Sequence, residues 1–290
     1  FLTGREQIAV PKERRKARDF IKITGAVKHN LKNISVAFPL DVVTVVTGVS
    51  GSGKSTLVRE VLYKQMLRYL DRKEGLPLSR DEAQTDHSTL LSGELNRIKA
   101  VAYVDQNNAG RSSRSNPVTY MGAYDFIREL FAAQPLAKQM GYQPYYFSFN
   151  RPGGRCEECK GEGTVTIEMQ FMADLTLTCT ECGGKRFRKE ILEVTYAGIN
   201  IFQLLEMSVN EATDFFTEHP TQPQTDNIIS ILKVLQKVGL GYIKLGQSVS
   251  TLSGGENQRL KLAYYLAKPH TEATLFFFDE PTTGLHFHDI

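Results

Sequence analysis

Short apolar runs separated by turn residues dominate the first hundred positions of the chain. Residues 20–24 (FIKIT) and 33–38 (NISVAF) have the length and the composition of β-strands. Residues 42–48 (VVTVVTG) form a continuous valine and threonine run that ends in glycine, which predicts a strand buried on both faces. Residues 99–106 (KAVAYVDQ) predict a further strand, whereas residues 71–97 are polar and predict a loop.

Apolar residues at helical spacing predict most of the remaining elements. A helix is expected over 55–70, where Leu57, Val61 and Leu62 recur on one face. In the second half of the chain, Asn210 is expected to cap one of two short helices. Further helices are predicted over 118–134, 200–207, 209–219, 227–240 and 256–267.

The composition limits the kind of protein. The chain has 290 residues, 41% of them hydrophobic, which is enough for one large domain or two ordinary ones. Its apolar runs are shorter than the ~18 residues of a membrane-spanning helix, and its first ten residues do not resemble a signal peptide. The net charge of +3 permits nucleic-acid binding through local patches without requiring it. All four cysteines fall in two Cys-x-x-Cys pairs, so we expect a soluble cytoplasmic protein with no membrane partner.

A glycine-rich loop lies between a predicted strand and a predicted helix. Its glycines let successive backbone N–H groups turn inward around phosphate groups, and the helix N-terminus adds a partial positive charge. In such a loop Lys54 reaches the β- and γ-phosphates of ATP, and Ser55 binds Mg²⁺. The expected ATP-binding residues are Gly48, Ser50, Gly51, Ser52, Gly53, Lys54, Ser55 and Thr56.

Two carboxylates follow the apolar run at 275–278 (LFFF), which predicts a last buried strand. Asp279 and Glu280 would then lie at the carboxyl end of a sheet, where open α/β folds bind ligands. Asp279 can hold Mg²⁺ through water, and Glu280 can polarise the water that attacks the γ-phosphate. Alone, the pair would fit a polar turn before Pro281 equally well, but beside a phosphate loop it predicts hydrolysis of ATP.

The segment at 252–256 (LSGGE) precedes the last predicted helix. Ser253, Gly254 and Gly255 offer a hydroxyl and backbone N–H groups at a helix N-terminus, which predicts a second anion site. Read alone, the segment is more typical of an ordinary serine cap.

These motifs together resemble the ATP-binding cassette (ABC) ATPase superfamily, in the order GVSGSGKST, Gln106 after a strand, LSGGE and LFFFDE. The resemblance implies that Gln106 senses the nucleotide and belongs to the catalytic set with Lys54 and Glu280. It also implies that the LSGGE of one cassette completes the ATP site of a second cassette, within one chain or in a homodimer.

Four cysteines lie between the phosphate loop and the LSGGE segment. The two Cys-x-x-Cys pairs are nineteen residues apart, a spacing that suits a closed tetrahedral Zn²⁺ site. A redox dithiol or a rubredoxin-like iron site would use the same residues. Between the pairs, 164–171 alternates between apolar and polar residues, which predicts a β-hairpin that turns at 172–174. The expected zinc ligands are Cys156, Cys159, Cys179 and Cys182.

Several long segments resemble one ABC family, the UvrA family of DNA excision repair, and match its C-terminal cassette. They are VTGVSGSGKSTL, GRSSRSNPVTY, FSFNRPGGRCEECKGEG, IEMQFMADL, CTECGGKRF, GLGYIKLGQ, TLSGGENQRLKLA and DEPTTGLHFHDI. The resemblance implies an α/β fold, with a P-loop ABC-type ATPase core and a mostly helical signature-domain insertion that carries the zinc-bound hairpin. It implies an ATPase of nucleotide excision repair that recognises DNA damage by binding duplex DNA, with partners of the UvrB and UvrC type.

The chain also departs from the family pattern. Three segments differ from the residues that are commonest in the family: SSR, the two asparagines after Gln106, and the aromatic PYYFSFN. The chain could therefore also be a UvrA-like paralogue. ABC ATPases carry a switch histidine on the strand after the carboxylates, and His286 and His288 come too early to supply it. We therefore expect this chain alone to hydrolyse ATP slowly.

Basic residues near the cysteines are candidates for contacts with DNA phosphates, although a solvated surface would have the same composition. Arg111 and Arg114 follow Gln106 closely, so the nucleotide could bias a DNA-facing surface. The candidates are Arg111, Arg114, Asn116, Arg155, Lys185, Arg186 and Arg188.

The motifs divide the chain into four parts. These are a basic linker over 1–19, an ATP-binding core over 20–115, a signature-domain insertion over 116–250 with its zinc module at 151–190, and the LSGGE helix and last strand over 251–290.

Two other functions use the same motifs: an ATP-driven dimerisation scaffold and the ATPase component of a membrane transporter. The zinc hairpin argues against the transporter, because coupling to a membrane domain needs a short helical region at that place.

Overall fold

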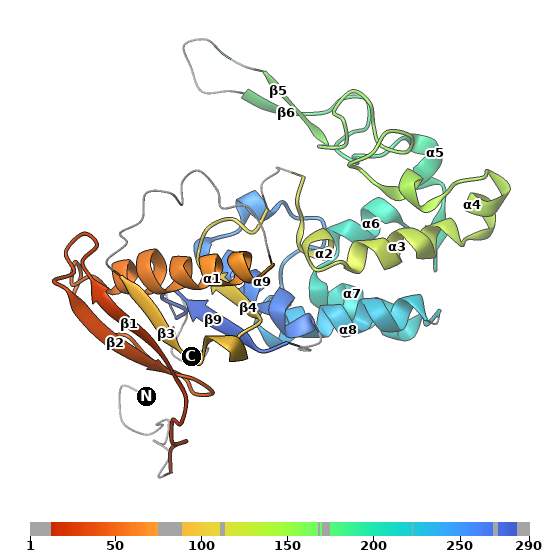
Figure 1. Ribbon diagram of the computed structural model, residues 1–290. Coiled ribbons are helices and arrows are strands. Elements are labelled where there is room, and N and C mark those ends of the chain that lie inside the picture. Colours follow the sequence, from red (N-terminus) through yellow and green to blue (C-terminus); the bar gives the residue numbers. More distant parts are fainter. Residues whose placement is uncertain are drawn as a thin grey trace, which may run out of the picture.

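The computed structural model describes residues 13–74, 89–110, 114–167, 169, 175–221, 223–268 and 272–282. Figure 1 shows a lobe of strands at one end, a helical lobe at the other, and a hairpin that projects from the helical lobe. Several predicted features lie outside the described residues: positions 1–12 of the linker, Arg111, the hairpin turn at 172–174, His286 and His288. None of the described helices combines the length and the apolar content that crossing a bilayer requires.

A three-stranded antiparallel sheet forms the outer part of the first lobe. Strand β1 (Phe20–Ala26) pairs on one side with β2 (Ile34–Pro39) and on the other with β3 (Leu90–Gly93). Ile21 and Ile23 alternate with exposed polar residues and are buried, as the strand prediction requires. The prediction of a loop over 71–97 is wrong at 71–74, where a helix continues, and at β3. This strand is too short to show a pattern of its own and is defined by its pairing with β1.

A second, parallel sheet joins two distant parts of the chain. Strand β4 (Ala100–Val104) pairs with β9 (Thr274–Phe278), and the register brings Val104 opposite Phe278. Because parallel strands end at the same edge, the residues that follow β4 and those that follow β9 emerge side by side.

The strand predicted over 42–48 is wrong. This segment forms no strand with any described residue, and Val43 and Val45 are 93% and 75% exposed. A run of valine and threonine becomes a buried strand only when neighbours cover both of its faces and both of its edges. Here β4 and β9 pair with each other, and a cavity of about 380 Å³ separates the segment from β9.

The predicted helix after the glycine loop is present. It begins with a π-helical stretch (η1, Thr56–Tyr63) and continues as α1 (Lys64–Glu74). Leu57, Val61 and Leu62 are buried with Ile21 and Phe277 in one hydrophobic core, which fixes this helix to both sheets.

Glu60 ties this helix to the β1–β2 turn. Its carboxylate accepts from Lys64 at 2.6 Å and from Lys28 at 3.1 Å. The hydrogen bond from Lys64, opposed by burial and assisted by Lys28, lowers the pKa of Glu60 from 4.5 to about 2. A lowered pKa stabilises the folded state above pH 4.5, and this stabilisation is lost as the pH falls towards 2.

We therefore expect Glu60→Gln to lower the free energy of unfolding by about 1 kcal/mol at pH 7, since the group is partly exposed. The difference from the wild type should shrink below pH 4.5. Urea unfolding at pH 7 and at pH 3 measures it, with Glu129→Gln on an exposed helix face as control. An unchanged difference at both pH values would exclude the ion pairs as its cause.

The helical lobe has its own, larger core. Its large buried side chains include Phe131, Phe147, Phe149, Phe187 and Phe216, each of which contributes roughly 1.5–3 kcal/mol by burial. The helices of this lobe are α2 (Pro117–Tyr120), α3 (Ala123–Ala132), α4 (Pro135–Gln139), α5 (Lys189–Leu192), α6 (Ile201–Glu206), α7 (Val209–Glu218) and α8 (Gln224–Lys237), with α9 (Gly254–Ala267) joining it to the sheets.

Several helix boundaries differ from the prediction, and two of the differences have a clear local cause. The helix expected over 118–134 is interrupted at Gly122, whose φ of +80° is left-handed and ends α2 before α3 begins. The cap of α7 is Ser208, not Asn210: its hydroxyl accepts from the N–H of Glu211, and the Glu211 carboxylate accepts from the N–H of Ser208.

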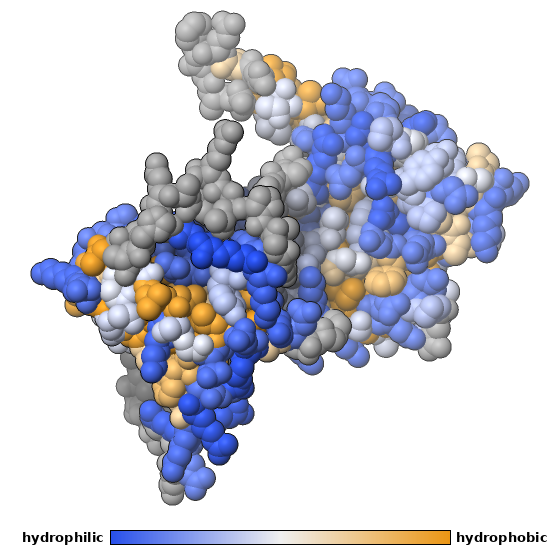
Figure 2. Space-filling model, in the orientation of Figure 1, coloured by the Kyte–Doolittle hydropathy of each residue, from blue (hydrophilic) through white to orange (hydrophobic). Residues whose placement is uncertain are grey.

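The predicted hairpin is present as β5 (Thr164–Ile167) and β6 (Leu175–Thr178), with Ile167 opposite Leu175. Ile167, Leu175 and Leu177 are each 46% exposed. Figure 2 accordingly shows apolar surface on this projecting arm. A second short pair, β7 (Thr195–Tyr196) and β8 (Ile199–Asn200), lies in the helical lobe.

Candidate functional site

The predicted phosphate loop is held in a compact conformation. The Lys54 ammonium donates to the carbonyls of Gly48 and Val49, at 2.8 and 2.9 Å, and Asn30 donates to the carbonyl of Gly51 at 2.7 Å. Gly48 has a φ of +155°, and a Cβ there would lie 2.8 Å from the Ser52 hydroxyl oxygen. The loop therefore excludes side chains from its interior, as a phosphate cradle requires.

One cavity joins this loop to the two carboxylates. Lys54 and Ser55 line it from the loop, and Asp279 and Glu280 line it from the end of β9. The space of about 380 Å³ also contacts Tyr103. Two pairs of residues that are far apart in the sequence thus face the same cavity.

Asp279 is fixed at three atoms. Its N–H donates to the carbonyl of Val104 at 3.1 Å, its carbonyl accepts from Gln258 Nε2 at 2.7 Å, and its Oδ2 accepts from the Tyr103 hydroxyl at 2.9 Å. Burial, together with the hydrogen bond to Asp279, raises the pKa of Tyr103 well above its usual value, so this hydroxyl remains a donor. The neighbouring Glu280 is exposed and has a left-handed φ of +47°.

The LSGGE segment begins α9 with a capping box. The Ser253 hydroxyl accepts from the N–H of Glu256 at 3.3 Å, and the Glu256 carboxylate accepts from the N–H of Ser253 at 2.7 Å. Gly254 lies against Gln106, since a Cβ at Gly254 would be 3.2 Å from that side chain. Gly255 follows in the first turn of the helix. Gln106 and the LSGGE segment therefore meet, and Gln106 follows the strand that ends beside Asp279.

The first turns of α9 are joined to the segment after β4. The buried Asn257 accepts from the N–H of Ala109 at 3.0 Å and donates to the carbonyl of Leu252 at 3.0 Å. Lys261 forms a partly buried ion pair with Asp105. Burial opposes ionisation of Asp105, but the hydrogen bond and the charge of Lys261, together with hydrogen bonds from Asn107, outweigh it and lower the pKa of this carboxyl.

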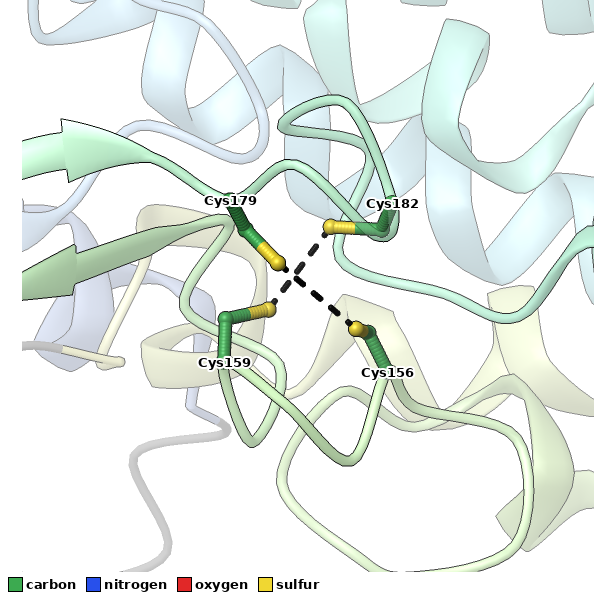
Figure 3. A group of neighbouring side chains, drawn as sticks. All are labelled: Cys156, Cys159, Cys179 and Cys182. Carbon is green, nitrogen blue, oxygen red and sulfur yellow. Dashed lines mark hydrogen bonds between the residues drawn. The ribbon is translucent and has the colours of Figure 1, made fainter.

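The four cysteines form a single buried cluster, with all four sulfur atoms within 4.8 Å of one another. Figure 3 shows them pointing to a common centre, with Cys156 Sγ 3.9 Å from Cys179 Sγ and Cys159 Sγ 3.7 Å from Cys182 Sγ. A tetrahedron of sulfurs with zinc–sulfur bonds of ~2.3 Å has edges of about 3.8 Å. The residues present therefore fit a zinc ion.

Burial raises the pKa of Cys156 and Cys182, whereas the backbone N–H of Cys182 lowers that of Cys179.

Several of the basic and polar residues considered for DNA have other partners. Asn116 is 1% exposed and caps α2, so it is excluded as a surface contact. Arg186 donates to the carbonyl of Gly246 at 3.0 Å and lies over the ring of Phe149. Arg155 is held by Asn150 and Glu157. Charge alone predicts neither the burial of Asn116 nor the contact of Arg186 with a residue 60 positions away.

Two other candidates lie at the surface of the cysteine module, and a third lies on the connector after Gln106. Lys185 and Arg188 are exposed. Arg114 is half-buried and pairs with Glu162 at 3.2 Å, which joins the connector after Gln106 to the cysteine module. The residue after Arg114 continues this link, because the carbonyl of Ser115 accepts from the N–H of Val249 just before the LSGGE segment.

Tyr103, Gln258, Asn257 and Lys261 were not predicted from the sequence. One signal for Asn257 was available: it lies three residues before Leu260 and six before Ala263, on the face of α9 that is completely buried. A polar residue in a buried helical stripe indicates a hydrogen-bonded role.

The chain is similar to known proteins over its whole length. The family model described as ABC transporter matches residues 157–283. UvrABC system protein A of Clostridium perfringens is 49% identical over all of this chain and 29% of that protein, and that of Aquifex aeolicus is 50% identical over all of this chain and 30% of that protein. The crystal structure of UvrA2 from Deinococcus radiodurans superposes with a TM-score of 0.85 at 42% identity, covering 99% of this chain and 32% of that one. The chain thus spans about three-tenths of the length of these relatives.

Proposed function

This chain is homologous to UvrABC system protein A over its whole length, and we propose that it is an ATP-binding cassette that couples ATP to the binding of duplex DNA in nucleotide excision repair. The observation that carries the proposal is the cavity that brings Lys54 and Ser55 together with Asp279 and Glu280. A glycine loop and a pair of carboxylates could each serve other functions, but this combination is what phosphoryl transfer to water requires.

Lys54 is the residue that changes partners when ATP binds. Its ammonium now contacts the carbonyls of Gly48 and Val49 and would exchange them for the more negative phosphate oxygens. The loop glycines leave room for the phosphates between backbone N–H groups. Glu280, which lines the same cavity, would orient the attacking water and accept its proton.

Ser55 and Asp279 would hold Mg²⁺, since a hydroxyl and a carboxylate are the oxygen ligands that this ion prefers. When bound, Mg²⁺ neutralises charge on the phosphates. The fixed carboxylate of Asp279 and the cavity that it shares with Ser55 support this assignment.

A second cassette would complete the ATP site. Ser253, Gly254 and Gly255 lie at the start of α9 and offer backbone N–H groups to the phosphates of ATP bound by that partner. The contact of Gly254 with Gln106 links this surface to the chain's own nucleotide-sensing residue.

DNA would meet the cysteine module. Zn²⁺ bound by the four cysteines would fix the base of the hairpin, and the exposed Lys185 and Arg188 beside it suit phosphate contacts. The Arg114–Glu162 pair supports coupling between this module and the connector after Gln106. By homology, partners of the UvrB and UvrC type would act on the resulting complex.

The test combines zinc content with retention of duplex DNA on a gel, with and without Mg·ATP. We expect about one zinc per chain, and a change in DNA affinity of about fivefold or more when Mg·ATP is added, as for a typical coupling free energy. The proposal would be contradicted if the protein contained no zinc, or if its affinity for DNA were the same with and without Mg·ATP.

Alanine at both Lys185 and Arg188 tests the DNA surface in the same assay. It should weaken binding of every duplex alike, because phosphate contacts carry no sequence information. The control is alanine at the exposed Lys233 of α8, which removes a charge of the same sign from the helical lobe and should have little effect.

A further inference from the structure

A polar bridge connects the LSGGE helix with the carboxylate Asp279. Gln258, the fifth residue of α9, is 4% exposed, and its amide nitrogen donates at 2.7 Å to the carbonyl of Asp279 and at 3.4 Å to that of Val104. These two carbonyls belong to the ends of β9 and β4, where the parallel ladder stops. Gln258 therefore ties both strand ends to the start of the helix that presents the LSGGE segment.

Tyr103 holds the side chain of the same aspartate. It lies on β4 opposite Phe277 of β9, and its hydroxyl donates to Asp279 Oδ2 at 2.9 Å. Its ring packs on Tyr63 and lies under the guanidinium of Arg59, so the hydroxyl has little freedom to move. One carboxylate oxygen of Asp279 thus accepts from Tyr103, and the other would be the one that holds Mg²⁺.

We infer that Gln258 and Tyr103 are positioning residues, which hold Asp279 in the position where it would bind Mg²⁺. Through Gln258, the position of Asp279 also depends on the position of the LSGGE helix. The inference rests on the proposed nucleotide site and goes beyond it. A displacement of α9, as when a second cassette presses on its N-terminus, would move the Asp279 carbonyl through a single hydrogen bond. Each cassette would thereby adjust its own metal site to the presence of its partner.

Two substitutions with matched controls test the inference in the full chain. Tyr103→Phe removes only the hydroxyl, and Gln258→Leu removes the donor at nearly constant volume. Tyr69→Phe is the control for the first, because Tyr69 also donates to a side chain, Asn96, and has no contact with Asp279. Gln236→Leu is the control for the second, because that amide pairs with Asn210 at the surface.

The measurement is the binding of a fluorescent ATP analogue as Mg²⁺ is titrated, and again in excess EDTA. Loss of an outer contact to a metal ligand typically costs 10- to 100-fold in metal affinity. We expect Tyr103→Phe and Gln258→Leu each to raise the Mg²⁺ concentration at half-maximal binding roughly 10-fold. Affinity for the analogue in EDTA, and all values for the two controls, should stay unchanged.

An unaltered Mg²⁺ dependence in Tyr103→Phe would overturn the inference even if Gln258→Leu fails to fold. An equal loss of affinity with Mg²⁺ and with EDTA would also overturn it, because it would indicate a general structural role. A wild-type chain that binds no analogue under either condition would overturn the nucleotide site itself, which is a different and recognisable result.

Discussion

Replacing Glu280 by glutamine is expected to lower ATP turnover by roughly 100- to 10,000-fold while ATP affinity stays near that of the wild type. The amide keeps the size of the side chain and cannot accept a proton from the attacking water. Affinity should survive because Lys54, Ser55 and Asp279 line the cavity independently of this carboxylate. Phosphate release and binding of an ATP analogue measure the two quantities.

Glu272→Gln is the matched control for this prediction. Glu272 lies two residues before β9, is exposed, and is at the opposite end of the strand from Glu280. A Glu280→Gln protein that turns over ATP at the wild-type rate would assign the base to another residue.

Replacing Cys179 by serine is expected to remove zinc from the protein and to open the cysteine module to proteases. Structural zinc contributes about 10–16 kcal/mol in small zinc-binding peptides, and a closed site of four thiolates does not tolerate the loss of one. Cys179 is fully buried, so no other described ligand can take its place without rearrangement of the module. The zinc content should fall below about one-tenth per chain.

Limited proteolysis locates the consequence of that substitution. New cleavage is expected within 151–188, while the core built around Phe131 and Leu232 keeps the rest of the helical lobe folded. Thr180→Ser, at the exposed neighbouring position, should change neither zinc content nor cleavage. A zinc-free Cys179→Ser protein with the wild-type cleavage pattern would show that the module folds without metal.

The motifs that could be predicted from the sequence are those whose functional residues lie next to one another in the chain. The glycines of the phosphate loop, the apolar run before Asp279 and the paired cysteines each specify a local structure. Their spacing alone indicates what they could bind. The hairpin between the cysteine pairs followed from alternation, because its period of two is a local property of β-strands.

The remaining features depend on contacts between distant segments. The contacts from Tyr103 to Asp279 and from Gln258 to Val104 span 176 and 154 positions, and no local pattern encodes them. The same reason explains why the contact of Arg186 was not predicted: this residue looks like a surface charge in the sequence, but it donates to the carbonyl of Gly246 across 60 positions. The valine run at 42–48 has a high local propensity for β-structure, yet it forms no strand. In the described part of the chain, no neighbouring strand pairs with its edges.

The most direct measurement of the central claim is the retention of duplex DNA by the wild type and by Lys54→Ala, each with and without Mg·ATP. The claim is that ATP held by the phosphate loop governs how the zinc-bearing module holds DNA. It predicts that DNA affinity of the wild type changes with Mg·ATP, whereas that of Lys54→Ala is the same with and without it. An equal response to Mg·ATP in both proteins, or none in the wild type, would contradict the account.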